Sequence, residues 1–139
     1  MNDRPDLVDA DFAHFAGIKA LNMGLCNNPA LTSAAFAHLR SVHTLWMEGC
    51  SQASLGDAAL AHLRGVHTLD MWGCTQATLT DGAFAHLRGV HTLDMRGCDQ
   101  PGITGATLSH LRGVRALHMR GCAPAVIATA RALQFFVRA

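Results

Sequence analysis

The five cysteines of this 139-residue chain recur at one fixed interval, which raises the question of metal or redox chemistry. They are Cys26, Cys50, Cys74, Cys98 and Cys122, and each follows the previous one by 24 residues. Zinc sites favour cysteine pairs two to four residues apart, and the sequence contains no such pair. Buried cysteine usually behaves as a small hydrophobic residue and a weak donor. We therefore expect an inward ladder of thiols that donate to neighbouring loop backbone, and no metal site.

Histidine follows the same period in two columns. One column comprises His14, His38, His62, His86 and His110, and the other comprises His43, His67 and His91. A stacked row of imidazoles can bind a transition metal, but these positions lack a carboxylate or cysteine that would complete a ligand set. The interpretation that we favour is a hydrogen-bonded ladder, which recurs because the unit was duplicated.

Signatures of catalysis, of cofactors and of other compartments do not stand out. The sequence has no nucleophile–base pair, no glycine-rich phosphate loop and no recurring acid–base carboxylates, so we expect a non-enzyme without a cofactor. The formal net charge is +1, which argues against nucleic-acid binding. The most apolar tract, 123–137, is short and interrupted by Arg131, so no membrane span is expected. With a polar N-terminus and an odd number of cysteines, we predict a cytoplasmic protein.

The elements that must position these side chains obey the 24-residue period as well. The aliphatic columns are Ile18, Val42, Val66, Val90 and Val114; Leu21, Leu45, Leu69, Leu93 and Leu117; and Met23, Met47, Met71, Met95 and Met119. Leu69 and Met71 alternate with their neighbours, as in a strand with one buried face. Phe84 and Leu87 are three residues apart, which suits a short helix. Glycine at the position of Gly89 is expected to end that helix.

One unit reads Val66-x-x-Leu69-x-Met71-x-x-Cys74, followed by Leu79-Thr80-Asp81. This pattern resembles the leucine-rich-repeat family, specifically its cysteine-containing class, and the resemblance covers residues 7 to 122. It implies an α/β solenoid, a right-handed horseshoe arc with a concave parallel sheet, short convex helices and about five 24-residue units. Units of this class more often run slightly longer, which here shortens the outer segment only.

The chain is expected to form a single leucine-rich-repeat domain over residues 1–139. Residues 1–17 form an N-terminal partial unit, residues 18–122 form five in-phase units, and residues 123–139 form a C-terminal cap. The cap supplies one more outer segment without a following strand. Phe135 and Phe136 suit a solvated end poorly. They are expected to fold under as a cap or to pair with another chain, giving a homo-oligomer through the solenoid ends.

The units differ most at the strand positions that point away from the core. The predicted binding residues on the concave face are Trp46, Glu48, Asp70, Trp72, Asp94, Arg96, His118 and Arg120. Tryptophan is enriched at binding hot spots, and strand geometry places Trp46 and Trp72 roughly 8 Å apart. A fixed scaffold with a varying face indicates a binding surface. Neutral drift on an unimportant face, with tryptophans that merely cover their neighbours, is the alternative.

Three functions follow from these features. The leading prediction is a non-catalytic interaction module that binds a protein or peptide on the concave face. Such units are similar to the substrate-recognition arms of F-box ubiquitin-ligase adaptors, although this sequence shows no F-box segment. The alternative is a structural protein that self-assembles end to end. An enzyme or enzyme regulator is the third, and no residue carries that role.

Overall fold

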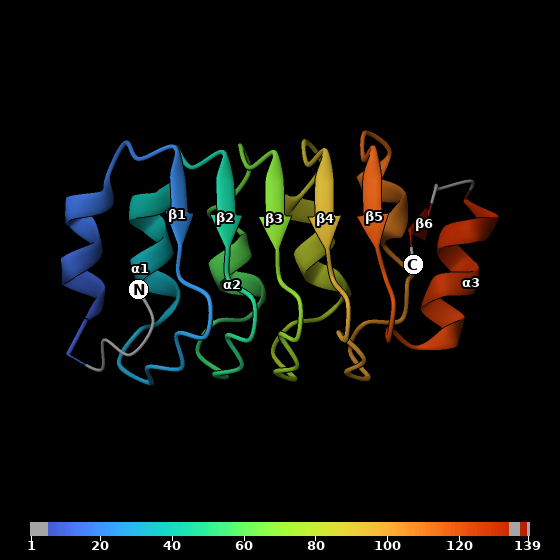
Figure 1. Ribbon diagram of the computed structural model, residues 1–139, viewed down its shortest axis with the longest axis horizontal. Coiled ribbons are helices and arrows are strands. Elements are labelled where there is room, and N and C mark those ends of the chain that lie inside the picture. Colours follow the sequence, from blue (N-terminus) through green and yellow to red (C-terminus); the bar gives the residue numbers. More distant parts are fainter. Residues whose placement is uncertain (1–5, 134–136, 139) are drawn as a thin grey trace.

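The computed structural model describes residues 6–133 and 137–138 as one open sheet with a layer of short helices behind it (Figure 1). Within the described residues the sheet has six strands in chain order, and every neighbouring pair is parallel. The strands are β1 (Ala20–Asn22), β2 (Thr44–Trp46), β3 (Thr68–Asp70), β4 (Thr92–Asp94), β5 (Ala116–His118) and β6 (Val137–Arg138). The predicted α/β class with a parallel sheet is therefore confirmed.

The register of the sheet follows the period of the sequence. Leu45 of β2 lies opposite Leu21 on one side and Leu69 on the other, each 24 residues away. Backbone hydrogen bonds continue the ladder beyond the three-residue strands, because the Met47 amide donates to the Asp70 carbonyl at 2.8 Å. Short strands are therefore stabilised by pairing over a longer stretch than their bounds indicate.

Short helices follow the strands on the far side of the sheet. They are η1 (Asp9–Phe15), α1 (Ser33–Phe36), η2 (Ala37–Leu39), α2 (Asp57–Leu60), η3 (Asp81–His86), η4 (Leu108–Leu111) and α3 (Pro124–Ala132), where η marks 3-10 geometry. The Thr80 hydroxyl caps η3 by accepting from the Gly82 amide at 3.2 Å. None of the helices in the described residues is long and apolar enough to cross a bilayer.

The glycines that require an unusual backbone are not those expected from the sequence. Gly89 lacks the left-handed conformation expected at the end of a helix, and a Cβ there would meet nothing closer than 3.8 Å. A left-handed φ occurs instead at Gly17, which follows η1 with 84°, and after the strands, where Gly49, Gly73 and Gly97 have φ values of 70°, 71° and 72°. Glycine is favoured at these sites because a side chain strains that conformation.

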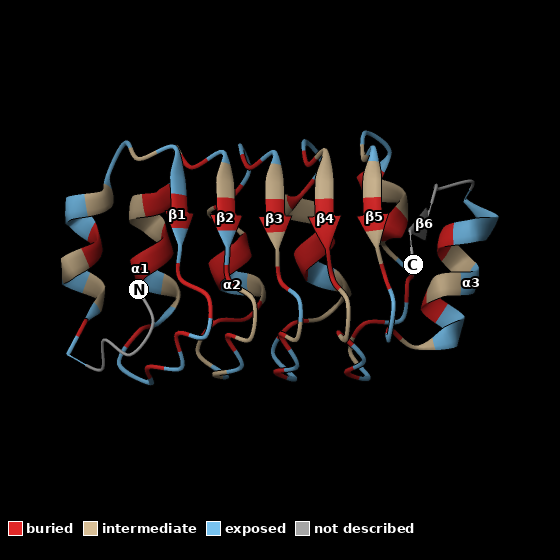
Figure 2. Cartoon of the chain, viewed as in Figure 1, coloured by how far each residue is buried: buried red, intermediate tan, exposed pale blue. Residues whose placement is uncertain are grey.

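The core lies between the sheet and the helices. Leu69 and Met71, which the alternation predicts to face inward, are 0% and 1% exposed. The largest core side chains are phenylalanines from the helical layer, among them Phe12, Phe36 and Phe84. The centre of each strand from β1 to β5 is buried (Figure 2).

The C-terminal segment differs from its prediction. A strand, β6, does follow α3, and it pairs with β5 through Leu117↔Val137 and His118↔Arg138. This strand could not be predicted, because no sixth copy of the leucine and methionine columns follows Cys122. An open strand edge offers unpaired backbone groups, and the chain end meets some of them on β5. Phe135 and Phe136, expected to cap the end, lie outside the described residues, as do residues 1–5.

Two further rows of polar side chains join neighbouring units. The Asp57 carboxylate accepts from the amide and hydroxyl of Thr80, at 2.7 and 2.5 Å, and Asp81 does the same for Thr104. In the same loop that leads to η3, the buried Gln76 side-chain amide donates to the Leu55 carbonyl at 2.7 Å. These bonds satisfy backbone groups that the short elements leave unpaired.

The imidazoles of the histidine row next to the strands are stacked, and in the described part of the chain no side-chain hydrogen bond joins them, in contrast to the hydrogen-bonded ladder expected from the sequence. The rings of His43 and His67 have centroids 5.0 Å apart, and those of His67 and His91 are 4.9 Å apart, at angles of 17° and 20°.

Candidate functional site

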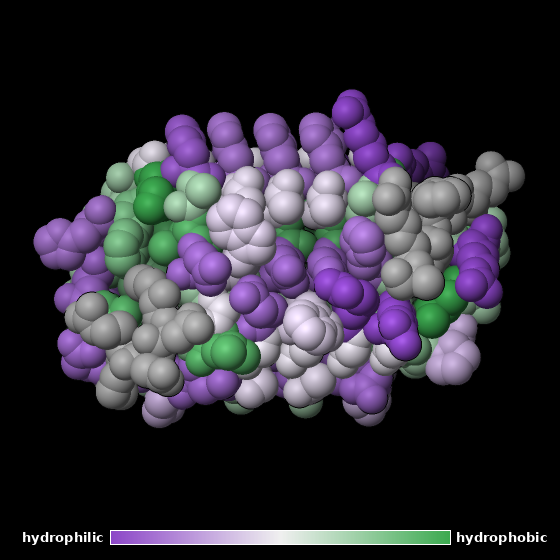
Figure 3. Space-filling view, in the orientation of Figure 1, coloured by the Kyte–Doolittle hydropathy of each residue, from purple (hydrophilic) through white to green (hydrophobic). Residues whose placement is uncertain are grey.

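The structure brings the predicted face residues together on the side of the sheet that is opposite the helices. One row follows the strand register, with Trp46 opposite Asp70 and Asp70 opposite Asp94. The second row lies two residues later and is aligned by backbone bonds, such as that from the Gly73 amide to the Arg96 carbonyl at 2.8 Å. Figure 3 views this face and shows mainly hydrophilic and neutral side chains over the strands.

Both tryptophans lie outside the core. Trp46 is 38% exposed and Trp72 is 53% exposed. Their neighbours Leu45, Met47 and Met71 are fully buried, so the indoles occupy the outward phase of the alternation. An exposed indole in a rigid setting is a ready contact for a partner, because it offers a large surface at little cost in side-chain entropy.

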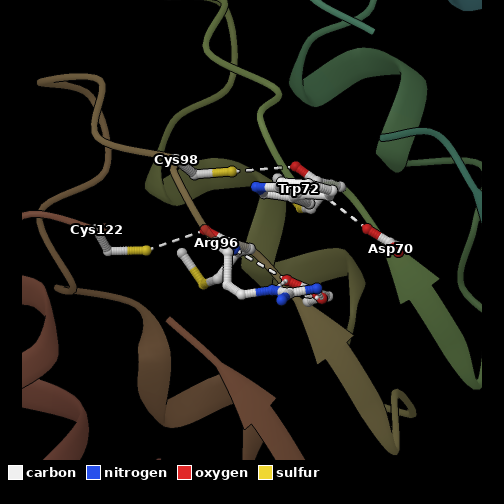
Figure 4. A network of polar contacts seen from close by, with 8 residues as sticks. Asp70, Trp72, Arg96, Cys98 and Cys122 are labelled. Carbon is white, nitrogen blue, oxygen red and sulfur yellow. Dashed lines mark hydrogen bonds and ion pairs between the residues drawn. The ribbon is translucent and has the colours of Figure 1, made fainter. Parts of the chain in front are cut away.

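Trp72 is held in place by its neighbours. The Arg96 guanidinium carbon lies 5.1 Å from the Trp72 ring centroid, which is cation–π range. The Trp72 amide donates to the Asp70 carboxylate at 3.0 Å, which fixes the backbone where the indole begins. Figure 4 shows Asp70, Trp72 and Arg96 side by side at the ends of β3 and β4.

Asp94 occupies a different environment from the one predicted. It is only 8% exposed, because Arg96 folds back over it with Nε 2.9 Å and Nη2 2.6 Å from its carboxylate oxygens. The hydrogen bond to Asp94, followed by its charge, raises the pKa of Arg96. Asp94 therefore orients Arg96 from beneath and is not itself a contact surface.

Two carboxylates, those of Asp70 and Glu48, lie beside the tryptophans. The pKa of Asp70 is raised, first by burial and then by the charges of Asp94 and Glu48, although the hydrogen bond from the Trp72 amide lowers it. One carboxylate oxygen of Glu48 is buried without a hydrogen-bond partner. Glu48 lies over Gly24, where a Cβ would collide with the carboxylate. Leaving this oxygen unpaired costs free energy, because a buried acceptor without a donor is desolvated without compensation.

The β5 side of the face is less enclosed. His118 is half-buried and Arg120 is exposed. His118 lies beside Arg138 in the β5–β6 register, so β6 forms the margin of the face here. These two residues extend the face without joining the cluster around Trp72.

Leu25 is a face residue that the sequence analysis missed. It is 58% exposed and adopts a left-handed φ of 59°, in the column where the next units have Gly49 and Gly73. Its side chain crosses Gly49, since a Cβ there would lie 2.6 Å from Leu25 Cδ2. The signal was present in the sequence, because leucine breaks a column of glycines. A bulky residue in this conformation is strained and is worth testing for function.

The cysteine ladder offers no reactive group at this face. All five cysteines are buried and free, and four of the thiols donate to backbone carbonyls as expected, from Cys50 to Met23 at 3.1 Å and likewise from Cys74, Cys98 and Cys122. Burial raises the pKa of Cys50 and Cys98 to about 12, so the nucleophilic thiolate is disfavoured. In the described residues no three His, Cys, Asp or Glu side chains are grouped to hold a metal ion.

The face thus offers an apolar and aromatic surface, an anchored cation and carboxylates, which are groups for noncovalent recognition. Comparison of the chain with protein-family models finds no match, and none of the curated proteins matches its sequence.

Proposed function

We propose that the chain is a leucine-rich-repeat solenoid of the cysteine-containing class, with about five 24-residue units and a concave sheet face. Its support is the coincidence of period and register: residues 24 apart, such as Leu45 and Leu69, are neighbours in the sheet. The thiol-to-carbonyl bonds repeat with the same step, as in Cys74 to Met47 and Cys98 to Met71.

The proposed function is noncatalytic binding of a protein or peptide on the sheet face. The observation that carries it is the pair of half-exposed tryptophans on adjacent strands, one of them fixed by Arg96. Binding interfaces concentrate their energy in a few aromatic and arginine residues within a polar rim. Here Trp46 and Trp72 serve as anchors, and Glu48 and Arg96 make the charged contacts.

We expect Trp46→Ala/Trp72→Ala to keep the fold and to weaken a face-directed peptide by about 3 kcal/mol or more, over 100-fold in Kd. The probe is a peptide selected against the wild type from a random display library. Titration calorimetry measures Kd, and circular dichroism checks the fold. The matched control is Val8→Ala/Leu133→Ala, which truncates exposed apolar residues away from the face.

The proposal fails if the double tryptophan variant binds with unchanged Kd, or if the control variant loses as much affinity. Unfolding of the double tryptophan variant would instead assign the indoles to the core. The single substitutions Trp46→Phe and Trp72→Phe then separate the two roles, because phenylalanine keeps packing but reduces the contact surface.

End-to-end self-assembly has less support at the N-terminal end. There η1 closes the core, with Phe12 fully buried and Phe15 packed edge-on against it at 5.2 Å. A covered end leaves little apolar surface for a second copy.

A further inference from the structure

A row of arginines marks the edge of the molecule where each helix ends and the next strand begins. The row, here called the basic edge, consists of the exposed side chains Arg40, Arg64, Arg88 and Arg112. A second line of basic residues precedes the strands: Lys19, His43, His67, His91 and Arg115. Figure 3 shows hydrophilic side chains in a row above the start of the strands.

The basic edge is regular because successive turns stack closely. A Cβ on Gly65 would lie 3.8 Å from the Arg40 carbonyl, and one on Gly89 would lie 3.8 Å from the Arg64 carbonyl. The stacked imidazoles beside it, at 5.0 and 4.9 Å, give the step from unit to unit. The arginines therefore emerge at intervals of about 5 Å, the spacing of neighbouring strands.

Two open depressions of equal form lie between successive arginines. One, of about 440 Å³, is lined by Arg40, Ala61, His62 and Arg64. The other, of about 430 Å³, is lined by Arg64, Ala85, His86 and Arg88. Arg64 faces both, so an anion in either depression lies between two guanidinium groups.

Negative charge is segregated from this edge. The segments 38–44, 62–68, 86–92 and 110–116 contain no aspartate or glutamate. The ion pair in the described part of the chain joins Arg96 to Asp94 on the sheet face, and none engages the arginines of the basic edge. The small net charge of +1 therefore hides an uneven distribution, because basic residues gather at the basic edge and acidic residues lie in the rest of the chain.

We propose that the basic edge binds the phosphodiester backbone of a nucleic-acid strand without reading its sequence. Arginine forks match phosphate oxygens in paired contacts. None of the exposed large apolar residues of the described chain, Val8, Leu25, Trp46, Trp72 and Leu133, lines the two depressions, which therefore lack the anchors of a peptide interface. Single-strand binders commonly stack bases on aromatic side chains. The imidazoles beside the basic edge stack on one another instead, so they do not offer such a surface to a base. This activity is separate from the proposed sheet-face function.

Fluorescence anisotropy with a labelled oligothymidylate tests the proposal, with a duplex of the same length as a second probe. Arg64→Glu is expected to weaken binding at least 10-fold, because it reverses the charge shared by both depressions. Arg131→Glu, an exposed residue of α3 with the same change in net charge, is expected to change Kd less than about 2-fold. Four phosphate contacts predict a slope of log K against log salt near −3, at about 0.7 per contact on a single strand.

Equal losses in Arg64→Glu and Arg131→Glu would overturn the proposal, since binding would then follow net charge alone. Poly-glutamate of matched charge that competes as well as the oligonucleotide would also overturn it, in favour of an acidic protein partner. If Arg64→Glu melts early, Arg64→Gln and Arg88→Gln replace it, and each must lower the salt slope by about 0.7. Trp46→Ala/Trp72→Ala must keep its oligonucleotide affinity, which separates this site from the sheet face.

Discussion

Above about pH 9 the free energy of unfolding is expected to fall by roughly 1.4 kcal/mol per pH unit for each buried thiol. Burial raises the pKa of Cys50 and Cys98 to about 12 and that of Cys122 to about 11. The pKa of Cys74 is raised as well, again chiefly by burial. Four thiols acting together would remove about 5 kcal/mol per pH unit, as much as the whole stability of a marginal domain.

The sign follows from proton binding. In the unfolded chain thiols ionise near pH 8.5 to 9, while in the folded chain they stay protonated to about pH 11 or 12. Between these limits the unfolded state holds fewer protons, so rising pH favours unfolding. Below about pH 8 both states are protonated and this contribution to stability is fully present.

Urea unfolding followed by circular dichroism at pH 8, 9 and 10 measures the effect. Few other groups interfere, because the chain has no tyrosine and Lys19 is its single lysine. The control variant Cys74→Ala/Cys98→Ala removes two thiols and should reduce the slope by about half, whatever its stability at pH 8. A free energy of unfolding that stays constant from pH 8 to 10 would show that the thiols do not ionise on unfolding as described.

Leu69→Ala is expected to destabilise the protein by about 2–5 kcal/mol, the usual cost of a cavity at a fully buried leucine. Leu69 is 0% exposed and lies in register between Leu45 and Leu93. In a stacked array a weakened central unit loses its contacts with both neighbours. The same substitution at Leu21, on the terminal strand β1 and 6% exposed, should therefore cost less.

Urea midpoints and slopes for Leu69→Ala, Leu21→Ala and Thr68→Ala provide the comparison. Thr68 lies next to Leu69 but is half-buried on the outer phase of the strand, so its truncation should cost less than about 1 kcal/mol. A cost at Leu21 that equals or exceeds the cost at Leu69 would contradict a stack whose stability comes from neighbours on both sides.

The sheet and its register could be predicted from the sequence because a fixed period leaves little freedom. Once Leu45 and Leu69 occupy equivalent strand positions 24 residues apart, stacking places one opposite the other. The alternation of Leu69 and Met71 with polar neighbours also fixes which face is buried. The exposed tryptophans follow from the same alternation, and they are where it puts them.

Other features could not be read from the period. Alternation predicts the direction of Asp94 but not that the long Arg96 side chain folds back and covers it. Strand β6 has no counterpart among the earlier units, so no column marks it. The arginine column was visible in the sequence, but the net charge does not show that basic and acidic residues are separated. Arg64 becomes part of a basic edge only when the acidic residues are known to lie elsewhere.

Among the described residues, the hydrogen bonds between units join residues only one unit apart, as with Gln76 and Leu55, 21 residues apart, or Cys98 and Met71, 27 residues apart. Within residues 6–133, a pulling force on the two ends would therefore meet no tie that spans the array. The molecule should lengthen in steps, one turn peeling away at a time, instead of rupturing all at once. For the same reason the array could grow by whole inserted turns while each existing turn keeps its surroundings.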